Sequence, residues 1–357
     1  MPERPTRLAM IGCGLIAQAH GLAANRSALP IQFVASSSRS LSSAQSFATE
    51  FACERAYADH RQLLRNEDLD GVVIAAPPAA HKQIILDCLD AGIKNILCEK
   101  PLSLTGEEAR LVTNMAQETS ANLLEGFMYR HHPQISRSLE IIRSGSLGKI
   151  DHFQSSITML DPSETEEQDL PENWRRDADE GGGVLHDFLC YPIDAANLFI
   201  GSTPVKAFAH TINSPRYNTV YRIYAIIEYA NGAMATLSAS RLSDFSQPLS
   251  ISCSKGSLSL DVAYNPIGNS SIKIRQVSGL IATKENRISI KTPETNSTRL
   301  LDLPVFGIQL EHFAMVIQGR QQPLISMQES VTNARLRDAL IESSRKDQWV
   351  EVDRALI

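Results

Sequence analysis

The sequence predicts an α/β domain with a doubly wound parallel sheet, followed by an α+β domain with a large open, mostly antiparallel sheet. Short apolar runs alternate with amphipathic stretches up to about residue 125, which is typical of strand–helix–strand crossovers. Later runs of alternating residues are joined by turn signals, which is typical of hairpins. The chain of 357 residues is also longer than one core usually supports. We therefore predict domains at residues 1–125 and 126–357.

The first domain is predicted from its strand and helix patterns. Short apolar runs bounded by Gly, Pro, Asn or Ser predict strands at 8–11, 31–35, 72–75, 93–98 and 122–124. Helical spacing between them predicts helices at 15–25, 42–51, 79–91 and 106–119.

The second domain is predicted to combine helices with hairpins. Helices are expected at 134–144, 183–200, 306–318 and 327–346. Between about 205 and 290, runs such as 221–229 and 233–239 flank turn signals such as Asn231-Gly232 and predict an antiparallel sheet. The sequence offers no second set of strands to cover this sheet, so we expect another subunit to cover one face.

Composition excludes several classes of protein. A net charge of −6 and a pI near 5.9, with no cluster of Lys and Arg, argue against a nucleic-acid partner. The six cysteines are scattered without a C-x-x-C pair, which argues against a zinc site and a disulfide framework and favours a reducing compartment. We expect no metal site.

The amino-terminal apolar run allows two interpretations. Arg4 and Arg7 precede residues 8–24, as in a signal peptide, but Gln18 and His20 interrupt the run. We favour a buried strand followed by a glycine turn. No segment reaches the ~18–20 uninterrupted apolar residues of a membrane span, so we expect a cytoplasmic protein with no membrane partner.

The turn after the first predicted strand carries a G-x-G-x-x-A sequence, Gly12-Cys13-Gly14-Leu15-Ile16-Ala17. This pattern, between a strand and a helix, is typical of the dinucleotide-binding turn of a Rossmann domain. Gly12 permits the tight turn, Gly14 lets the pyrophosphate approach the backbone, and Ala17 lets helix and strand pack closely. The alternative is a glycine turn without a ligand.

The end of the second predicted strand favours NADP(H) over NAD(H). NAD-binding domains usually place an Asp or Glu about 20 residues after the glycines, where it binds the ribose 2′-hydroxyl. This chain instead has Ser36-Ser37-Ser38-Arg39-Ser40, whose hydroxyls and guanidinium suit a 2′-phosphate. NAD remains possible, and the alternative is a solvated serine-rich turn.

Two further segments carry groups suited to proton transfer. Cys98-Glu99-Lys100-Pro101 ends a predicted strand at the edge where doubly wound sheets bind ligands. The helix entered through Gly181-Gly182-Gly183 would place Asp187, Tyr191 and Asp194 on one face. A nearby ammonium lowers the pKa of a tyrosine, which is ordinarily about 10, so Lys100 and Tyr191 could transfer the proton of an alcohol. Periodicity alone favours a core tyrosine.

These segments together resemble the glucose–fructose oxidoreductase/inositol dehydrogenase (Gfo/Idh/MocA) family over most of the chain. The resemblance includes the glycine turn with His20, Ala76-Pro77-Pro78 with His81, Glu99-Lys100-Pro101, residues 125–134 and the Gly181–Asp194 segment. The stretch from Pro323 to Val350 is similar as well. Tyr191 and the segment 128–134 resemble the branch that contains dimeric dihydrodiol dehydrogenase and xylose dehydrogenase.

The resemblance implies roles for named residues. Lys100 and Tyr191 would be the catalytic pair, and Asp187 would bind or orient the substrate. Further residues would contact the cofactor: Gly12, Gly14, Leu15, Ile16, Ala17, Ser37, Ser38, Arg39, Ala76, Pro77, His81, Glu99, Lys100, Trp174 and Arg175. The family usually has glycine where this chain has Leu189, which is expected to narrow or re-aim the pocket.

We therefore predict an NADP(H)-dependent dehydrogenase or ketoreductase acting on a sugar, a sugar derivative or a cyclic diol. The family's open sheet implies a homodimer or homotetramer through the carboxy-terminal sheet. The alternatives are a non-catalytic dinucleotide-binding sensor of the same fold and an enzyme that reduces a carbon–carbon or carbon–nitrogen double bond.

Overall fold

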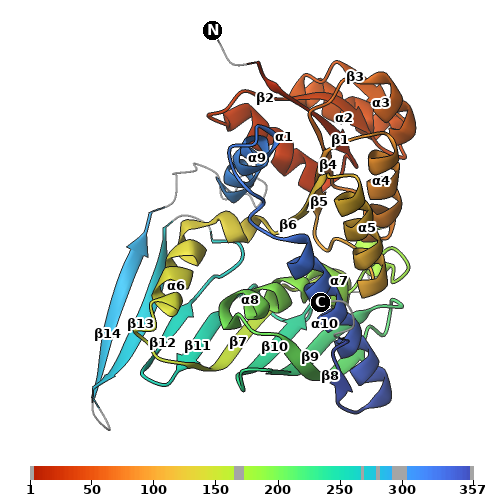
Figure 1. The fold of residues 1–357 in the computed structure, drawn as a ribbon. Coiled ribbons are helices and arrows are strands. Elements are labelled where there is room, and N and C mark those ends of the chain that lie inside the picture. Colours follow the sequence, from red (N-terminus) through yellow and green to blue (C-terminus); the bar gives the residue numbers. More distant parts are fainter. Residues whose placement is uncertain (1–3, 165–172, 267–268, 279–281, 292–303, 354–357) are drawn as a thin grey trace. The chain divides into compact units, whose positions relative to one another are not determined.

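The structure is a computed structural model that describes residues 4–164, 173–266, 269–278, 282–291 and 304–353. The chain forms two compact units (Figure 1). The first contains residues 1–131 and 294–331, and the second contains residues 132–293 and 332–357. The single boundary predicted near residue 125 is therefore incomplete, because the chain returns to the first unit before it ends.

The returning segment belongs to the first unit because its helix α9 (Pro304–Ile317) packs on α1 (Leu15–Arg26). The carboxylate of Glu311 on α9 accepts hydrogen bonds from the Ser27 hydroxyl and the Ala28 N–H. Phe306 contacts the His20 ring edge-on, at 5.4 Å between ring centroids. The residues that form these contacts are nearly 300 positions apart in the sequence, so local sequence patterns could not predict them.

The first unit is built on a six-stranded parallel sheet with the order β3-β2-β1-β4-β5-β6. Its strands are β1 (Thr6–Ile11), β2 (Ile31–Ser37), β3 (Arg55–Tyr57), β4 (Gly71–Ile74), β5 (Asn95–Glu99) and β6 (Asn122–Gly126). The helices between them are α1, α2 (Leu41–Phe51), α3 (His60–Asn66), α4 (Pro78–Asp90) and α5 (Gly106–Glu118). The doubly wound parallel sheet is confirmed, whereas β3 and α3 were not predicted.

The two missed elements are short, with three and seven residues, which explains why periodicity did not reveal them. The central strand β4 is buried at all four positions, because helices cover both faces of a parallel sheet. The core of this unit collects apolar side chains from both layers, among them Ile74 of β4, Ile85 of α4 and Val112 of α5.

The second unit is built on a nine-stranded, mostly antiparallel sheet with the order β14-β13-β12-β11-β7-β10-β9-β8-β15. Its strands are β7 (Ile150–Thr158), β8 (Pro204–Asn213), β9 (Val220–Tyr229), β10 (Met234–Ser240), β11 (Leu249–Cys253), β12 (Gly256–Leu260), β13 (Ser270–Ser278), β14 (Ala282–Ile290) and β15 (Val350–Glu351). One central pair, β7 with β10, is parallel.

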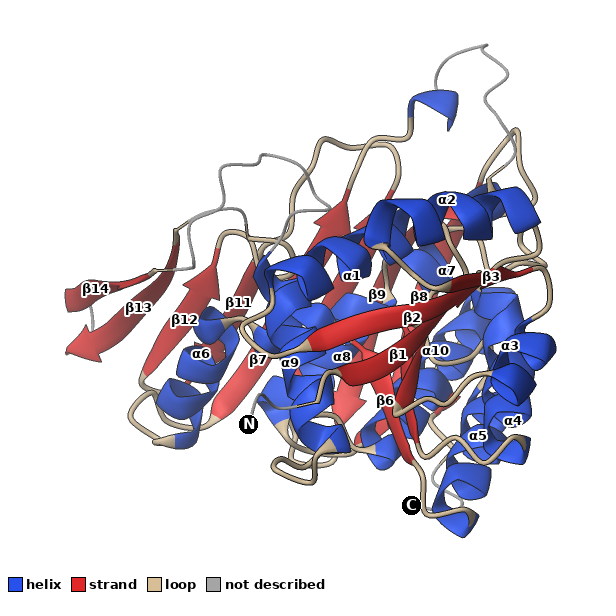
Figure 2. Ribbon diagram, turned by 90° about the horizontal axis from the view of Figure 1, so that it is seen from above, coloured by secondary structure: helices blue, strands red, loops and turns tan. Residues whose placement is uncertain are grey.

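Helices cover one face of this sheet. In Figures 1 and 2, α6 (Pro133–Arg143) and α8 (Cys190–Ile200) lie against it on the same side, and the second unit also holds most of α10 (Met327–Lys346). Strand β9 alternates accordingly: Ile223, Ala225 and Ile227 are buried, whereas Tyr224 and Ile226 are exposed on the opposite face.

The predicted helix over residues 183–200 is wrong in one respect, because it is two helices. A short α7 (Val184–Asp187) ends before Phe188, and α8 begins after Leu189. The Leu189 N–H donates to the Val184 carbonyl, five residues back, so the regular ladder is interrupted. Leu189 itself is fully buried.

The apolar amino-terminal run forms β1 and α1 rather than one continuous helix. Among the helices that the structure describes, none combines the length and the hydropathy that a membrane crossing needs.

Candidate active site

The carboxyl ends of the parallel strands bring four of the predicted segments to one edge of the first sheet. The Gly12 N–H donates to the Ser37 carbonyl at 2.8 Å, which joins the ends of β1 and β2. The Ala75 N–H donates to the Ile11 carbonyl at 2.8 Å, which joins β4 to β1. The strand order places a topological switch point between β1 and β4, and this is where doubly wound sheets bind ligands.

The reason for a glycine differs between the two glycine positions of the turn. Gly12 has a φ of +91°, and a Cβ built on it would lie 2.5 Å from the Ala76 N atom, so a side chain is excluded by the protein itself. Gly14 has an ordinary φ of −85°, and a Cβ there would meet no atom within 4 Å. The fold does not require glycine at position 14, whereas a pyrophosphate approaching the backbone would.

The helix that follows suits an anion at its start. Gly14 is the N-cap of the 12-residue α1 and offers no side chain to its first N–H groups. Leu15 is 56% exposed and Ile16 is half-buried, whereas Ala17 is fully buried against the sheet. The first turn of α1 therefore presents N–H groups and the positive end of the helix to this edge of the sheet, so the residues present fit a dinucleotide phosphate.

The serine-rich segment divides into structural and exposed residues. The Ser36 hydroxyl donates to the Ala44 carbonyl of α2, and the Ser40 hydroxyl caps α2 by accepting from the Ser43 N–H. Ser37 is buried, and its carbonyl accepts the hydrogen bond from Gly12. Ser38, which is half-buried, and Arg39, which is exposed, lie at the end of β2.

His81 connects the turn after β4 with the turn after β5. Its ring is fully buried on α4, with Nε2 2.9 Å from the Ala76 carbonyl oxygen and Nδ1 2.8 Å from the Pro101 carbonyl oxygen. Burial lowers the pKa of His81, although the two carbonyls and Glu99 act against this shift. The His81 ring therefore holds two backbone carbonyls, that of Ala76 just before Pro77 and that of Pro101 just after Lys100.

Lys100 directly follows β5, and its peptide bond to Pro101 is cis. The preceding Glu99 is held by α1, because His20 Nε2 lies 2.8 Å from Glu99 Oε1. A Cβ at Gly126 of the neighbouring β6 would lie 3.0 Å from the Glu99 Cα, so the missing side chain leaves room for the Glu99 backbone. Position 100 is therefore framed by α1, α4 and β6.

The glycine run of the second unit is dictated by close backbone contacts. Gly183 has a φ of +80°, and its Cβ would lie 2.7 Å from the Val220 carbonyl oxygen of β9. At Gly182 a Cβ would lie 2.5 Å from the Asp177 carbonyl oxygen. These contacts fix the chain just before α7, which carries Asp187.

Asp187 is a buried carboxylate that two guanidinium groups contact. Its Oδ2 accepts from Arg175 Nε at 3.0 Å and from Arg241 Nη2 at 2.6 Å. Arg175 also stacks on the Trp174 ring at 4.4 Å, so this part of the 3₁₀ turn Trp174–Arg176 is tied to α7. Charge-assisted hydrogen bonds of this kind favour the ionised form of Asp187.

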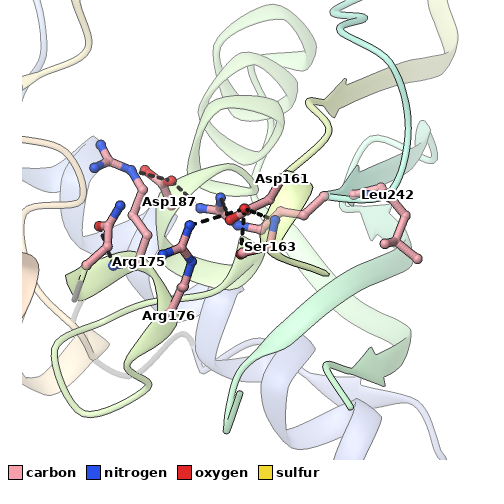
Figure 3. Close-up of polar contacts among 9 residues, drawn as sticks. Asp161, Ser163, Arg175, Arg176, Asp187 and Leu242 are labelled. Carbon is pink, nitrogen blue, oxygen red and sulfur yellow. Dashed lines mark hydrogen bonds and ion pairs between the residues drawn. The ribbon is translucent and has the colours of Figure 1, made fainter. Parts of the chain in front are cut away.

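A second carboxylate, Asp161, continues this network (Figure 3). Its Oδ1 accepts from the Ser163 N–H at 3.1 Å and the Ser163 hydroxyl at 2.7 Å, and from Arg176 Nη2 at 3.3 Å. Arg241 Nη1 lies 3.5 Å from Asp161 Oδ2. Burial raises the pKa of Asp161, but the bonds from Ser163 and Arg176 outweigh it and lower the pKa overall.

Tyr191 lies in the first turn of α8 as a result of the break in the helix. It is 7% exposed and contacts the Tyr264 ring at 5.4 Å between centroids. Tyr264 is anchored in turn, because its hydroxyl lies 2.6 Å from the Ser155 hydroxyl, which donates to the Pro248 carbonyl. Asp194 is fully buried and accepts from the Asn333 amide of α10 at 2.7 Å.

The predicted site residues thus fall into two groups. Those from Gly12 to Lys100 lie along one edge of the first sheet, and Trp174, Arg175, Asp187 and Tyr191 lie in the second unit. The contacts of Arg241, Asp161 and Arg176 with this site were missed. Their partners lie up to 80 residues away and come from loops, where the sequence carries no periodicity that could have indicated them.

The described residues hold no group of three or more His, Cys, Asp and Glu side chains suited to a metal ion. His132 caps α6 by accepting from the Gln134 N–H, and burial lowers its pKa to about 4. Burial also lowers the pKa of its neighbour His131 to about 3. The part of the loop 161–180 between 165 and 172 lies outside the described residues.

Models of two protein-family domains match the chain. Residues 6–127 match the oxidoreductase family with an NAD-binding Rossmann fold, and residues 136–259 match the GFO/IDH/MocA carboxy-terminal domain. Together these ranges cover more than half of the chain. The protein belongs to the Gfo/Idh/MocA oxidoreductase family.

Individual relatives agree with this membership. The chain is 28% identical to "D-xylose 1-dehydrogenase (NADP(+)) 2" of Haloferax volcanii, over 88% of this chain and 90% of the relative. A levoglucosan dehydrogenase solved with NADH and levoglucosan has a TM-score of 0.85 at 20% identity, over 98% of this chain and all of the other, and shows the common fold. A 3-ketoreductase of Actinomadura kijaniata solved with NADP and TDP-benzene has a TM-score of 0.81 at 25% identity, over 95% and 98% of the two chains.

Proposed function

We propose that this chain is an NADP(H)-dependent oxidoreductase that transfers a hydride between the nicotinamide and a hydroxyl or keto carbon of a sugar, a sugar derivative or a cyclic diol. The observation that carries the proposal is the edge of the first sheet, where the glycine turn follows β1 and Lys100 follows β5, the two strands that flank β4. A nicotinamide cofactor supplies or accepts the hydride when it is bound there.

The glycine turn would hold the pyrophosphate, with Gly14 giving the backbone access and the first turn of α1 supplying N–H donors. Ser38 and Arg39 would bind a 2′-phosphate, because hydroxyl and guanidinium groups donate to it and no carboxylate at this position repels it. Ala76, Pro77, His81 and Glu99 would line the nicotinamide end of the cofactor. These roles follow from the family resemblance and the placement of the side chains.

Lys100 and Tyr191 would handle the proton of the reacting hydroxyl. A phenol with an ordinary pKa of about 10 is a poor proton acceptor at neutral pH, and a nearby ammonium lowers that pKa. The position of Tyr191 in the first turn of α8 acts in the same direction, because the positive end of a helix stabilises an anion by about 0.3–1 kcal/mol. Tyr191 would take the proton during oxidation and return it during reduction.

Asp187 would orient the substrate by accepting hydrogen bonds from its hydroxyl groups. A carboxylate held by two guanidiniums is an acceptor and not a proton donor, so Asp187 would position the sugar while Tyr191 carries the proton. Trp174 and Arg175 would lie beside the nicotinamide.

The relatives favour catalysis over the sensor alternative, because those named above are dehydrogenases or reductases. A sensor of this fold has no need for a lysine at position 100 or a tyrosine at position 191. Reduction of a carbon–carbon or carbon–nitrogen double bond is the second candidate activity, since it would use the same cofactor site.

The chain would act as a homodimer or homotetramer that covers the open face of the second sheet. Exposed or half-buried apolar side chains gather on that face over β8, β9 and the start of β15. We call them the apolar patch: Phe208, Tyr224, Ile226 and Trp349. Such a patch on a sheet face is typical of a protein interface.

A substrate screen tests the proposed activity. The purified protein is incubated with NADP⁺ and D-xylose, D-glucose, myo-inositol, levoglucosan or a cyclic diol, and the absorbance of NADPH is followed. We expect at least one sugar or polyol to be oxidised. Turnover of a panel of enones or imines with NADPH, but of no sugar or polyol, would support the second candidate instead. No turnover of either panel would favour the sensor.

Two variants test the mechanism in the same assay. Lys100→Met should abolish turnover while leaving the Kd for NADPH within a few-fold of the parent. Tyr191→Phe, which keeps the ring against Tyr264, should reduce kcat by about 10²–10⁴-fold. Full activity of either variant would contradict the assignment of its residue.

A further inference from the structure

Arg241 is a buried arginine to which the mechanism above gives no role of its own beyond its contact with Asp187. It directly follows β10, and its side chain is 5% exposed. The guanidinium packs over the Phe188 ring at 4.6 Å, just where α7 ends. A cation removed from water to this degree is costly unless anionic partners compensate it.

Two carboxylates provide that compensation. Arg241 Nη2 lies 2.6 Å from Asp187 Oδ2, which is a short charge-assisted bond, and Nη1 lies 3.5 Å from Asp161 Oδ2. The Asp187 side chain is 3% exposed and that of Arg241 is 5% exposed, whereas that of Arg175 is 24% exposed. The ion pair of Asp187 with Arg241 is therefore less screened by solvent than its ion pair with Arg175.

Arg241 is itself held in place from the other side. Asp161 is fixed by the backbone and hydroxyl of Ser163 and by Arg176, so its carboxylate cannot turn away from Arg241 without losing those bonds. The resulting chain of contacts runs from Ser163 through Asp161 and Arg241 to Asp187, and joins the loop after β7 to α7.

We propose that Arg241 is a positioning residue that keeps Asp187 ionised and in one orientation, so that this site selects substrates with a hydroxyl donor next to the reacting carbon. The selection of substrates rests on the proposed function, whereas the ionisation and orientation of Asp187 do not depend on it. An ionised carboxylate only accepts hydrogen bonds, so it binds a sugar hydroxyl and repels a substrate carboxylate or phosphate at the same position.

Other charged or titratable groups lie on the elements next to Asp187, and the test must separate them from Arg241. These are Arg175 and Arg176 on the 3₁₀ turn, His186 on α7, Cys190, Tyr191 and Asp194 on α8, Tyr221 and Arg222 on β9, and Asp161 after β7. None of them is altered in the variants below.

The ionisation of Asp187 can be measured without a substrate. The full-length protein is labelled with ¹³C at the aspartate side-chain carboxyls, and the Asp187 signal is identified by its loss in Asp187→Asn. We expect Arg241→Met to raise the titration midpoint of this signal by about one pH unit or more, which is a tenfold or greater weakening of the acid. An unchanged midpoint would overturn the proposal.

Companion variants make this result specific. Arg241→Lys keeps the positive charge, so the Asp187 signal should have the same titration midpoint as in the parent. A midpoint raised as far as in Arg241→Met would contradict a role for the charge. Arg335→Met removes another buried arginine of the second unit, whose guanidinium bonds the Asp353 carbonyl, and should leave the midpoint unchanged. If Arg241→Met does not fold, as judged by circular dichroism, Arg241→Gln supplies the neutral variant.

A double-mutant cycle then tests whether Arg241 acts through Asp187. With the sugar that the screen finds most active, Arg241→Met should lower kcat/KM about tenfold in the parent and by less than about twofold in Asp187→Asn. Equal losses in both backgrounds would overturn the positioning role. These outcomes are distinct from a failure of the proposed function, which Lys100→Met reveals by retaining full activity.

Discussion

At the end of β2, Arg39 is exposed and Ser38 is half-buried. The sequence shows a run of five residues there, four of them serines. The structure gives two of those serines other tasks, because Ser36 bonds the Ala44 carbonyl and Ser40 caps α2. Selectivity for a 2′-phosphate would therefore depend mainly on the guanidinium of Arg39.

Arg39→Ala should raise the KM for NADPH about tenfold or more and change the KM for NADH little. A hydrogen bond to a charged group contributes roughly 1.5–3 kcal/mol, and the substitution would remove such a bond from the 2′-phosphate of NADPH. NADH has no 2′-phosphate, so its binding would lose no such bond. Steady-state kinetics with both cofactors measure this. Arg65→Ala, at an exposed arginine of α3, is the matched control. An equal effect on both cofactors would contradict the assignment.

At the scale of single elements, the break between α7 and α8 is the largest departure from the prediction. The spacing of Asp187 and Tyr191 suggested one helix face, yet Asp187 ends one helix and Tyr191 lies in the first turn of the next. Pro192 has no N–H to donate to the Phe188 carbonyl four residues back, and its ring clashes with that carbonyl in a continuous helix, so the break has a local cause. The break gives Tyr191 the environment of a helix start.

The glycine turn permits a prediction that separates folding from binding. Gly12→Ala should destabilise the fold by more than about 1 kcal/mol, because it forces a side chain into a positive φ and against Ala76. Gly14→Ala should leave the thermal midpoint unchanged, because its Cβ meets no atom within 4 Å.

Binding of NADPH, measured by the fluorescence of the bound cofactor, should nevertheless weaken about tenfold or more in Gly14→Ala, because the methyl group would occupy the space proposed for the pyrophosphate. The thermal midpoint and the affinity for NADPH of this one variant together separate an effect on folding from an effect on binding. A Gly14→Ala protein that is stable and binds NADPH as the parent does would contradict the assignment of this turn to the phosphates.

The contact between α3 and α4 predicts a dependence of stability on pH. Burial raises the pKa of Asp87, but hydrogen bonds from His60, Gln83 and Arg61 outweigh it and lower the pKa overall. The pKa of Asp87 in the folded state therefore lies below its unfolded value of about 3.9. The ionised carboxylate stabilises the fold above that pH, and this contribution is lost as the pH falls through the folded-state pKa.

Asp87→Asn should therefore lower the thermal midpoint at pH 7, and the difference from the parent should shrink below about pH 4. Differential scanning fluorimetry from pH 7 to pH 3 measures it. Asp90→Asn, an exposed carboxylate at the end of the same helix, serves as the control. A difference that stays constant down to pH 3 would show that the carboxylate charge of Asp87 is not responsible.

At the scale of the whole molecule, the second sheet leaves the apolar patch exposed in the described part of the single chain. Ile226→Glu should shift the protein to a smaller species in size-exclusion chromatography with light scattering, because a buried unpaired carboxylate disfavours association. Arg137→Glu on the exposed surface of α6 should leave the species unchanged. An Ile226→Glu protein of parental mass would place the subunit interface elsewhere.

The sequence by itself determined the alternation of strands and helices in the first unit, the glycine turn, the position of Lys100 and the hairpins of the second sheet. These features are encoded by neighbours within about 20 residues, through periodicity, turn residues and spacing. Only the tertiary structure decided that α9 belongs to the first unit and that Arg241 joins Asp161 to Asp187. Each of these depends on contacts between distant segments, whose free energy is realised only when the chain has packed, and no local pattern records them.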